Sequence, residues 1–432
     1  MEKLKQITDQ TIEALTKAGA DEAQCIVADA KVQEFNVDGG EFSLYRTLFD
    51  QSISMTVLKN HKKGETTINH FDKESIESAA TDCINVALSG HSDGAFAIGG
   101  EPGTHTFTTG CIEPDVDRLF ERIVELMDTV KQEYPLISIG EMVVQHKMTH
   151  SLYQNTKGSV YEHLNGTYIF ELVYSAHDGD ATSSISSVAV LTDDLDTPFI
   201  KLGSVAHDLK DAQEQIYTKP IQGKFTGVAV FTPACLMEML YYLTNNSLSD
   251  SVLINQTSVW KDKLNEKVAD EKLSIELAPL DPRIRGGERY TTDGAISKNY
   301  TLIDHGILKS FMLSLYGANK TGFTPAKNDS FNIIIEAGDT PFEDMIKKID
   351  HGIIVGGFSG GMPAINGEFS GVAKNSFLIE NGKISKALSE TMINGNLNEM
   401  VKQIVAISKE VVEDGHSVLP YVACDGIVIS GK

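Results

Sequence analysis

The sequence predicts an α+β protein, with a mixed α/β N-terminal domain and a β-rich C-terminal domain of barrel- or sandwich-like form that carries a few helices. A chain of 432 residues exceeds what one hydrophobic core usually fills. Helical and strand-like patterns are mixed in the first half, whereas short strands between glycine-bearing turns dominate the second. A proline and a glycine within residues 219–223 follow a helical pattern and precede a new strand. We therefore expect domains at 1–220 and 221–432, with division of the first into 1–110 and 111–220 as an alternative.

Helical periodicity predicts four helices in the first half. In the clearest, residues 115–133, apolar side chains recur on one face and Tyr134-Pro135 ends the helix. The others are expected at 3–19, at 72–88 with Asp72 as N-cap, and at 202–217. Strands are expected from about residue 23 and over 52–58, 65–69, 137–148, 160–174 and 184–191, with residues 90–109 as a loop.

The second half begins with an expected strand at 225–231, and Thr232-Pro233 then provides an N-cap and a proline at the first helical position. The helix that follows carries an apolar stripe at i, i+3, i+4 and i+7 spacing. Glycine turns at Asp293-Gly294 and at 304–306 separate the next expected strands. These strands cover 289–292, 295–303 and 307–315, and two further helices are expected at 341–349 and 396–407.

Residues 351–383 form a glycine-rich stretch threaded with apolar residues, which indicates folded β structure rather than a linker. Strands are expected at 352–355, 371–373 and 376–380. Gly357-Phe358-Ser359-Gly360-Gly361 has the G-x-S-x-G form of a nucleophile elbow. An elbow requires a helix directly after the serine, and the proline and glycine of residues 362–367 exclude one. Ser359 is therefore a weak nucleophile candidate, and a tight glycine loop is the preferred interpretation.

Charge and cysteine content exclude several classes of protein. The 37 basic and 60 acidic residues give a net charge of -23, which disfavours DNA and anionic membranes as partners. The five cysteines are dispersed and contain no C-x-x-C pair, so we expect neither a zinc knuckle nor a redox pair. The N-terminus lacks a signal-peptide pattern, and a cytoplasmic location is expected.

His146 and His150 have the four-residue spacing of a helical metal pair, but the residues around them alternate as in a strand. Positions four apart on a strand lie about 13 Å from each other, too far to share one metal ion. We expect two surface histidines on a hairpin.

Three segments resemble the TldD/PmbA (TldE) family of bacterial and archaeal peptidases: DHGILKSFMLSL at 304–315, NGEFSGVAKNSFLIENGK at 366–383 and SETMINGNLNEMVKQIV at 389–405. Their order, together with Thr257-Ser258-Val259-Trp260, residues 322–325 and the closing 417–429, extends the resemblance along the second half. The resemblance implies a dimer and cytoplasmic turnover or maturation of unfolded peptides. An older description of the family as a modulator of DNA gyrase implies a DNA or gyrase contact, which the charge disfavours.

The resemblance also implies a division of labour between two kinds of member. TldD-type members carry H-E-x-x-x-H on the helix after the first strand of the second domain, and a cysteine near the C-terminus, as zinc ligands. Aligned with that motif, this sequence has Met237, Glu238 and Tyr242, so both histidines are replaced. Thioether and phenol are poor zinc ligands beside imidazole. His416 lies where the cysteine is expected, and Cys424 falls too late. We expect no metal in this chain and zinc in a TldD-type partner.

The sequence therefore predicts a PmbA/TldE-like subunit of a TldD/TldE-type metallopeptidase, without a zinc site or catalytic group of its own. Glu238 is expected to be a solvated helix residue and only a weak catalytic candidate. The partner is a TldD-type subunit or a second copy, and the substrate is unfolded peptide. The expected peptide-binding residues lie on the glycine-rich stretch, namely Gly356, Gly357, Ser359, Gly360, Gly361, Phe369 and Ser370. The alternatives are a stand-alone serine hydrolase using Ser359 and a non-catalytic peptide-binding homodimer.

Overall fold

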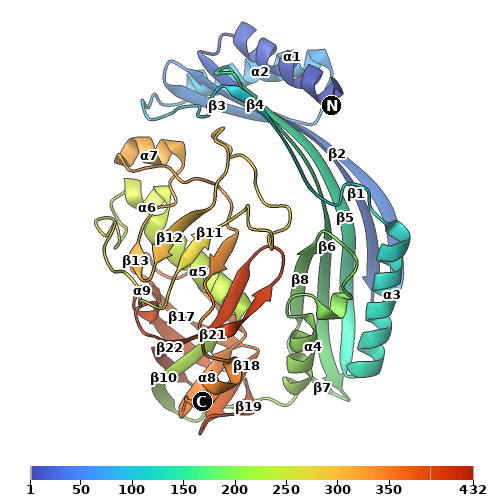
Figure 1. The fold of residues 1–432 in the computed structure, drawn as a ribbon, viewed down its shortest axis with the longest axis vertical. Helices are drawn as coiled ribbons and strands as arrows, with labels where there is room; N and C mark the ends of the chain where they lie inside the picture. Colours follow the sequence, from blue (N-terminus) through green and yellow to red (C-terminus); the bar gives the residue numbers. More distant parts are fainter. Residues whose placement is uncertain (1, 390, 432) are drawn as a thin grey trace.

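Two β-sheets organise the chain in the computed structural model, which describes residues 2–389 and 391–431 (Figure 1). An eight-stranded sheet is built from the first half and a 14-stranded sheet from the second. Figure 1 shows the first sheet as a long curved layer that extends along one side of the second domain. The α+β class with a β-rich second half is confirmed, and the change from one sheet to the other falls between Thr192 and Lys219. The exact boundary at 220/221 stays a prediction.

Four long antiparallel strands form most of the N-terminal sheet, in which the order is β3-β2-β1-β5-β6-β4 and β7 and β8 also pair with β6. These strands are longer than the sequence patterns predict, because they pair with neighbouring strands beyond the expected ends. The strands are β1 (Glu22–Asp38), β2 (Glu41–Lys59), β3 (Lys62–Ile68), β4 (Gly103–Gly110), β5 (Ile137–Asn155), β6 (Ser159–Asp178), β7 (Ala181–Thr182) and β8 (Ser186–Thr192).

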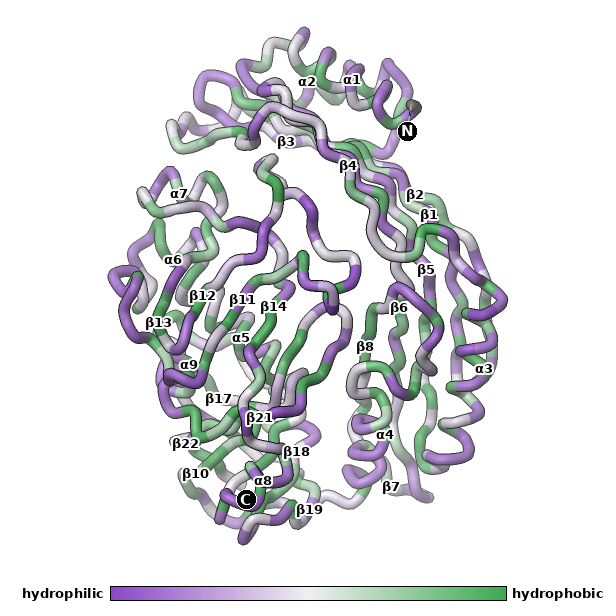
Figure 2. The backbone as a smooth tube through the Cα atoms, in the orientation of Figure 1, coloured by the Kyte–Doolittle hydropathy of each residue, from purple (hydrophilic) through white to green (hydrophobic). Residues whose placement is uncertain are grey.

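Helices cover both ends of the N-terminal sheet. α1 and α2 pack against β1 and β2 around one apolar core, and α3 packs against β1, β5 and β6 around another. Asp72 and Asp115 cap α2 and α3 by accepting hydrogen bonds from Ser75 N and Arg118 N, as predicted for Asp72. Hydrophobic and hydrophilic positions alternate along the turns of α3 in Figure 2, which is the pattern of a one-sided helix. The helices are α1 (Glu2–Lys17), α2 (Lys73–Ser89), α3 (Val116–Glu133) and α4 (Val205–Glu214).

The C-terminal sheet wraps around α5, whose buried face belongs to the largest apolar core of the molecule. Its main path is β13-β12-β11-β14-β22-β10-β15-β18-β19-β9, with β16, β17, β20 and β21 attached beside it. The strands are β9 (Lys219–Pro220), β10 (Lys224–Phe231), β11 (Ile275–Leu277), β12 (Tyr300–Asp304), β13 (Ile307–Leu308), β14 (Ile333–Ile335), β15 (His351–Val355), β16 (Gly357–Gly360), β17 (Glu368–Lys374), β18 (Ser376–Glu380), β19 (Lys383–Ser389), β20 (Met392–Asn396), β21 (Ile404–Glu413) and β22 (Val418–Ser430). The helices are α5 (Pro233–Leu248), α6 (Asp250–Ile254), α7 (Leu315–Thr321), α8 (Phe342–Lys347) and α9 (Leu397–Met400).

Several local predictions are wrong, and tertiary pairing explains two of them. Part of the expected loop at 90–109 forms β4, because it finds a parallel partner in β6. The expected strands at 289–292 and 295–303 are mostly irregular, and strand structure there is limited to β12 and one isolated bridge from Tyr290 to Ile296. The expected helix at 396–407 is only the four-residue α9, because residues from Ile404 onward pair with β22.

No helix among the described residues combines the length and the apolar character needed to cross a membrane.

Candidate functional site

Helix α5 places the residues that the sequence aligns with a zinc motif. Its N-terminus is fixed by Thr232, whose hydroxyl accepts a hydrogen bond from Cys235 N at 3.4 Å, and by Pro233 at the first turn. The predicted apolar stripe is buried in the core. Met237, Glu238 and Tyr242 therefore lie on the opposite, half-buried side of the helix.

Glu238 is not the solvated residue that the sequence suggests. Its side chain is half-buried, and burial raises the pKa of its carboxyl. The Tyr242 hydroxyl donates a hydrogen bond to Glu238 Oε1 at 3.4 Å, and Phe358 N–H also donates to this carboxylate. Both bonds lower the pKa and partly offset the burial. The carboxylate is thus held by strand β16 and by its own helix.

The donor set around Glu238 does not fit a zinc ion. Met237 and Tyr242 replace imidazoles with a thioether and a phenol, and the phenol is hydrogen-bonded to the glutamate. His416 lies in the turn between β21 and β22, where its Nδ1 and carbonyl oxygen face Asn332 Nδ2 at 3.3 and 3.0 Å. Cys424 is buried within β22, and burial raises the pKa of its thiol. Across the described ranges, no three His, Cys, Asp or Glu side chains are arranged to hold a metal ion.

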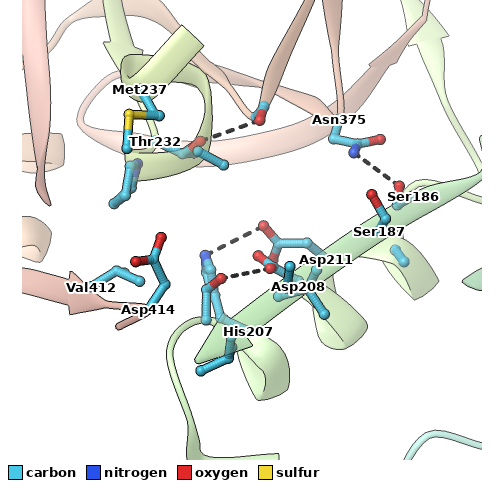
Figure 3. A pocket seen from close by; sticks show the side chains of 18 of the residues that line it. Ser186, Ser187, His207, Asp208, Asp211, Thr232, Met237, Asn375, Val412 and Asp414 are labelled. Atoms are coloured by element: carbon cyan, nitrogen blue, oxygen red, sulfur yellow. Dashed lines mark hydrogen bonds and ion pairs between the residues drawn. The ribbon is translucent and has the colours of Figure 1, made fainter. Parts of the chain in front are cut away.

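A pocket of about 330 Å³ opens beside the N-terminal end of α5, between the two domains (Figure 3). One wall comes from β8 and α4 of the first half, and the other from α5, the β15–β16 junction and the β21–β22 region. Asn375 Nδ2 donates to Ser186 Oγ at 3.0 Å and joins the two walls. The polar residues that line the pocket include Ser186, Ser187, Ser204, His207, Asp208, Asp211, Thr232, Asn375 and Asp414.

The pocket is acidic. Burial raises the pKa of Asp208 to about 6 and that of Asp211 to about 7. Ser204 Oγ donates to Asp208 at 2.7 Å, and His207 Nε2 lies 3.4 Å from Asp211 Oδ2. No lysine or arginine of the described chain lines this space. Sequence reasoning missed these residues, since an i, i+3 pair of aspartates on an amphipathic helix is ordinarily a solvated pair and nothing in the pattern reveals that another domain covers it.

The expected peptide-binding residues lie on one hairpin, β16–β17, next to this pocket. Gly356 lines the pocket, and the side chain of Ser359 and the backbone of Gly360 and Gly361 are exposed at the far end of β16. Phe369 is buried, and its ring packs edge-on against Phe358 with centroids 5.8 Å apart. Its ring therefore supports the hairpin from inside. Gly357 and Ser370 belong to the same strand pair.

Glycine serves mainly for close approach in this hairpin. A Cβ at Gly371 would lie 2.6 Å from the Phe358 ring, and one at Gly360 would lie 2.8 Å from it. The predicted tight loop at 357–361 is instead largely strand β16. Ser359 lies opposite Val372 in a β-hairpin, which is not the strand–turn–helix arrangement of a nucleophile elbow.

The two histidines of β5 are on a strand as predicted, but the expectation that they lie at the surface is wrong. His146 is buried with Nε2 2.6 Å from Cys111 O, and burial lowers its pKa. His150 Nε2 lies 2.7 Å from Glu162 Oε1 across the β5–β6 pair. The segment around Cys111 covers His146, which strand periodicity cannot reveal.

Residues 225–431 match the model of the PmbA/TldA metallopeptidase C-terminal domain. Residues 225–431 therefore carry the C-terminal domain of this metallopeptidase family. A metalloprotease PmbA homolog from Buchnera aphidicola is 25% identical over 413 residues, covering 92% of this chain and 88% of that protein. A PmbA homolog from Haemophilus influenzae is 21% identical over 451 residues, covering 100% of this chain and 97% of that protein.

Solved structures share the fold of this chain over its whole length. The crystal structure of TldE from Thermococcus kodakarensis has a TM-score of 0.83 at 20% identity, and covers 98% of this chain and 100% of that one. A candidate modulator of DNA gyrase from Bacteroides thetaiotaomicron has a TM-score of 0.86 at 20% identity, with 99% of each chain covered. The arrangement of a long curved sheet beside a second sheet that packs on α5 is thus shared with these structures.

Proposed function

We propose that this chain is the PmbA/TldE-like, non-catalytic subunit of a TldD/TldE-type metallopeptidase that degrades or processes unfolded peptides. The observation that carries the proposal is the replacement of both histidine ligands on α5 by Met237 and Tyr242, with Tyr242 hydrogen-bonded to Glu238. Zinc peptidases need imidazole, thiolate or carboxylate ligands around an open position. In this proposal, zinc and the activated water belong to a TldD-type partner.

Peptide binding is assigned to the β16–β17 hairpin and the pocket beside α5. Among the strands that the structure describes, β16 pairs only with β17, so its other edge carries no strand and, beyond the Phe358 N–H that Glu238 accepts, can take an extended backbone. Edge pairing uses backbone groups that every peptide has, and this suits unfolded substrates of many sequences. The side chain of Ser359 is exposed on this hairpin, where a bulky replacement would obstruct an incoming peptide.

The central experiment tests the division of labour. The purified chain, alone, is assayed for bound zinc by elemental analysis and for hydrolysis of an unfolded peptide. The assay is then repeated after mixing with the protein of the same cell that carries H-E-x-x-x-H. We expect neither zinc nor hydrolysis from the chain alone and hydrolysis from the mixture. Stoichiometric zinc with peptidase activity in the isolated chain, lost in Glu238→Gln, would contradict the proposal.

A second experiment addresses the peptide surface. Ser359→Tyr is compared with Ser251→Tyr, which is exposed on α6 away from the hairpin. Binding of a fluorescent unfolded peptide should weaken about tenfold in the first variant, equivalent to about 1.4 kcal/mol, and remain unchanged in the second. Equal binding by both variants would remove the hairpin from the proposal. Failure to recover any H-E-x-x-x-H partner from the native cell would favour the peptide-binding homodimer.

A further inference from the structure

A second pocket between the two domains is lined by cations. It has a volume of about 330 Å³. One wall consists mainly of alternate residues of β5 and β6, and the other is the segment 286–290 of the second domain. This segment meets the sheet at both of its ends. Tyr290 Oη and Ser151 Oγ are 2.8 Å apart, and a Cβ at Gly286 would lie 3.4 Å from Thr167 Oγ1. We call this space the β5–β6 pocket.

Arg289 is anchored in the wall of this pocket by one of its nitrogens. Nη1 donates to the carbonyl oxygens of Gly287, Pro279 and Glu288, at 2.8, 3.0 and 3.1 Å. Nε and Nη2 form another side of the guanidinium, and in the part of the chain that the structure describes they bind no acceptor. Burial lowers the pKa of Arg289. The residue is thus a half-buried cation with one side of its donor fork unused.

Arg283, six residues earlier, shows what that side of an arginine binds. Its Nε donates to Asp281 Oδ1 at 2.9 Å and its Nη2 to Asp281 Oδ2 at 3.0 Å, so one carboxylate takes both donors. Arg46 likewise uses Nε and Nη2 to hold Glu34 Oε1. Two parallel bonds of this kind are the strong, planar form of carboxylate recognition. The equivalent pair of donors on Arg289 is therefore suited to a carboxylate.

No carboxylate of the described residues fills this position on Arg289. The acidic side chain that affects its pKa is Asp193, which is itself paired with Arg285 at 3.2 Å. Glu288 also lines the pocket, but its carboxyl accepts hydrogen bonds from Ser297 Oγ and from a backbone N–H. A half-buried cation without a partner is costly. In a chain with 60 acidic and 37 basic residues, such an arginine indicates a partner from outside.

Two further side chains make the pocket suitable for an anion. Lys147 of β5 lines it and forms no ion pair within the described ranges. His163 of β6 also lines it, and burial together with the charge of Arg289 lowers the pKa of His163 to about 4. The positive field of Arg289 therefore reaches the opposite wall. A carboxylate between the two walls would be attracted by both cations.

We propose that the β5–β6 pocket binds a carboxylate of the peptide substrate, with Nε and Nη2 of Arg289 holding it from one wall and Lys147 from the other. The identity of the ligand as a peptide rests on the proposed function, whereas the recognition of a carboxylate does not. The group is either the C-terminal carboxylate or an acidic side chain, which share this chemistry. Edge pairing on β16 uses backbone groups and does not select a sequence. The pocket adds a selection for chains that present a carboxylate.

The first experiment compares three fluorescent unfolded peptides that bind to the purified full chain. They share one neutral sequence and end as a free acid, as an amide, or as an amide with one internal glutamate. We expect a peptide with a carboxylate to bind about tenfold more tightly than the plain amide, since hydrogen bonds to charged groups are the stronger ones. Tighter binding of the free acid assigns the site to the C-terminal group, and tighter binding of the glutamate peptide assigns it to an acidic side chain.

Variants of the two cations test the wall that each occupies. Arg289→Lys keeps the charge and loses the paired donors, and Lys147→Gln removes an exposed charge with little risk to the fold. The advantage of a carboxylate over the amide should fall about fivefold in the first and about threefold in the second. Arg283→Lys is the matched control, because Asp281 already occupies its donors, and it should leave the advantage unchanged. Urea unfolding checks that each variant is folded.

A small probe separates this inference from the proposed function. N-acetylglycine carries a carboxylate, and by neutralising Arg289 it should raise the pKa of His163. Between pH 7 and about pH 5 the probe is ionised, so His163 should begin to protonate in its presence and stay neutral without it. N-acetylglycinamide is the control and should have no effect. An NMR titration of the ring, assigned with His163→Gln, measures this.

Equal binding of all three peptides, or an advantage that both Arg289→Lys and Lys147→Gln leave intact, would overturn the carboxylate site while the proposed function stands. An advantage lost equally in Arg283→Lys would overturn it too, because the unused donors of Arg289 would not be its cause. Failure of N-acetylglycine to affect His163 would also count against the site. An effect of the probe without binding of any unfolded peptide would support the carboxylate site and contradict the proposed function.

Discussion

The Tyr242 hydroxyl donates to the Glu238 carboxylate across one turn of α5, at 3.4 Å. Glutamate is the only residue of the aligned zinc motif that the chain retains, and here a tyrosine in place of a histidine binds it. The half-buried glutamate is held within the protein instead of facing a metal-bound water.

Tyr242→Phe tests this relationship. The hydrogen bond from Tyr242 lowers the pKa of Glu238, so its loss should raise that pKa further above the ordinary value. The bond is long and partly exposed, and we expect the free energy of unfolding to fall by less than about 1 kcal/mol. An NMR titration of the Glu238 carboxyl carbon measures the first effect, and urea unfolding the second. A fall in the pKa would show that the hydroxyl does not donate to the carboxylate.

Asp211→Asn should stabilise the protein at neutral and alkaline pH. The pKa of Asp211 is about 7 in the folded chain, and the ordinary value is about 3.9 in the unfolded chain. Ionising the buried carboxyl therefore costs free energy above pH 7, and the cost disappears as the pH falls below about 4. We expect a gain on the order of 2 kcal/mol at pH 8 and none at pH 4, from urea unfolding.

The control for this measurement is Asp82→Asn, which changes an exposed aspartate on α2. It should alter stability by less than about 0.5 kcal/mol at either pH. A gain from Asp211→Asn that is the same at pH 4 and pH 8 would mean that removal of the charge is not its cause.

Gly64→Ala should destabilise the N-terminal domain. Gly64 lies in β3 under α2, and a Cβ there would be 2.1 Å from Cys83 O and 2.7 Å from Ala87 N. Both atoms are helix backbone, so the strand and helix must separate, at a cost of about 3 kcal/mol. Gly94→Ala is the control, because its Cβ would meet no atom within 4 Å and its φ is not positive. Equal unfolding midpoints for the two variants would contradict the packing.

Asp93→Ala should loosen the contact between the 90–102 segment and α7. Asp93 Oδ2 accepts hydrogen bonds from the Tyr316 hydroxyl and from Lys320 Nζ, each at 2.9 Å. The hydrogen bond from the Ala95 backbone N–H, together with these two, lowers the pKa of Asp93 to about 2. Hydrogen exchange should become faster in both segments and stay unchanged in α3, on the far side of the sheet. Unchanged exchange in α7 would show that other contacts hold it.

Local patterns predicted those elements that depend on neighbouring residues. The helix at 115–133, its end at Tyr134 and the Thr232 cap appear as predicted, because periodicity and capping involve residues within one or two turns. The turn at 304–306 is also as predicted, with positive φ at His305 and Gly306.

Elements that depend on distant partners were not predictable in the same way. β4 exists because Gly103–Gly110 finds β6, more than 50 residues later. The residues expected to continue α9 form β21 because β22 returns beside them. Hydrophobic content does not distinguish these outcomes, since the deciding hydrogen bonds are made by the backbone of a remote strand.

The sequence by itself predicted the α+β class, the resemblance of the second half to the PmbA/TldD family and the absence of histidines at the aligned zinc-motif positions, because residue identity alone decides which donor atoms are present at a position. The tertiary structure decided that Glu238 is half-buried and that Asp208 and Asp211 face a pocket shared by two domains. It also decided that, among the described strands, the first half of β2 pairs with β1 alone. Each of these depends on which distant surface covers a residue, and burial, pKa and strand pairing are set by that covering rather than by the residue itself.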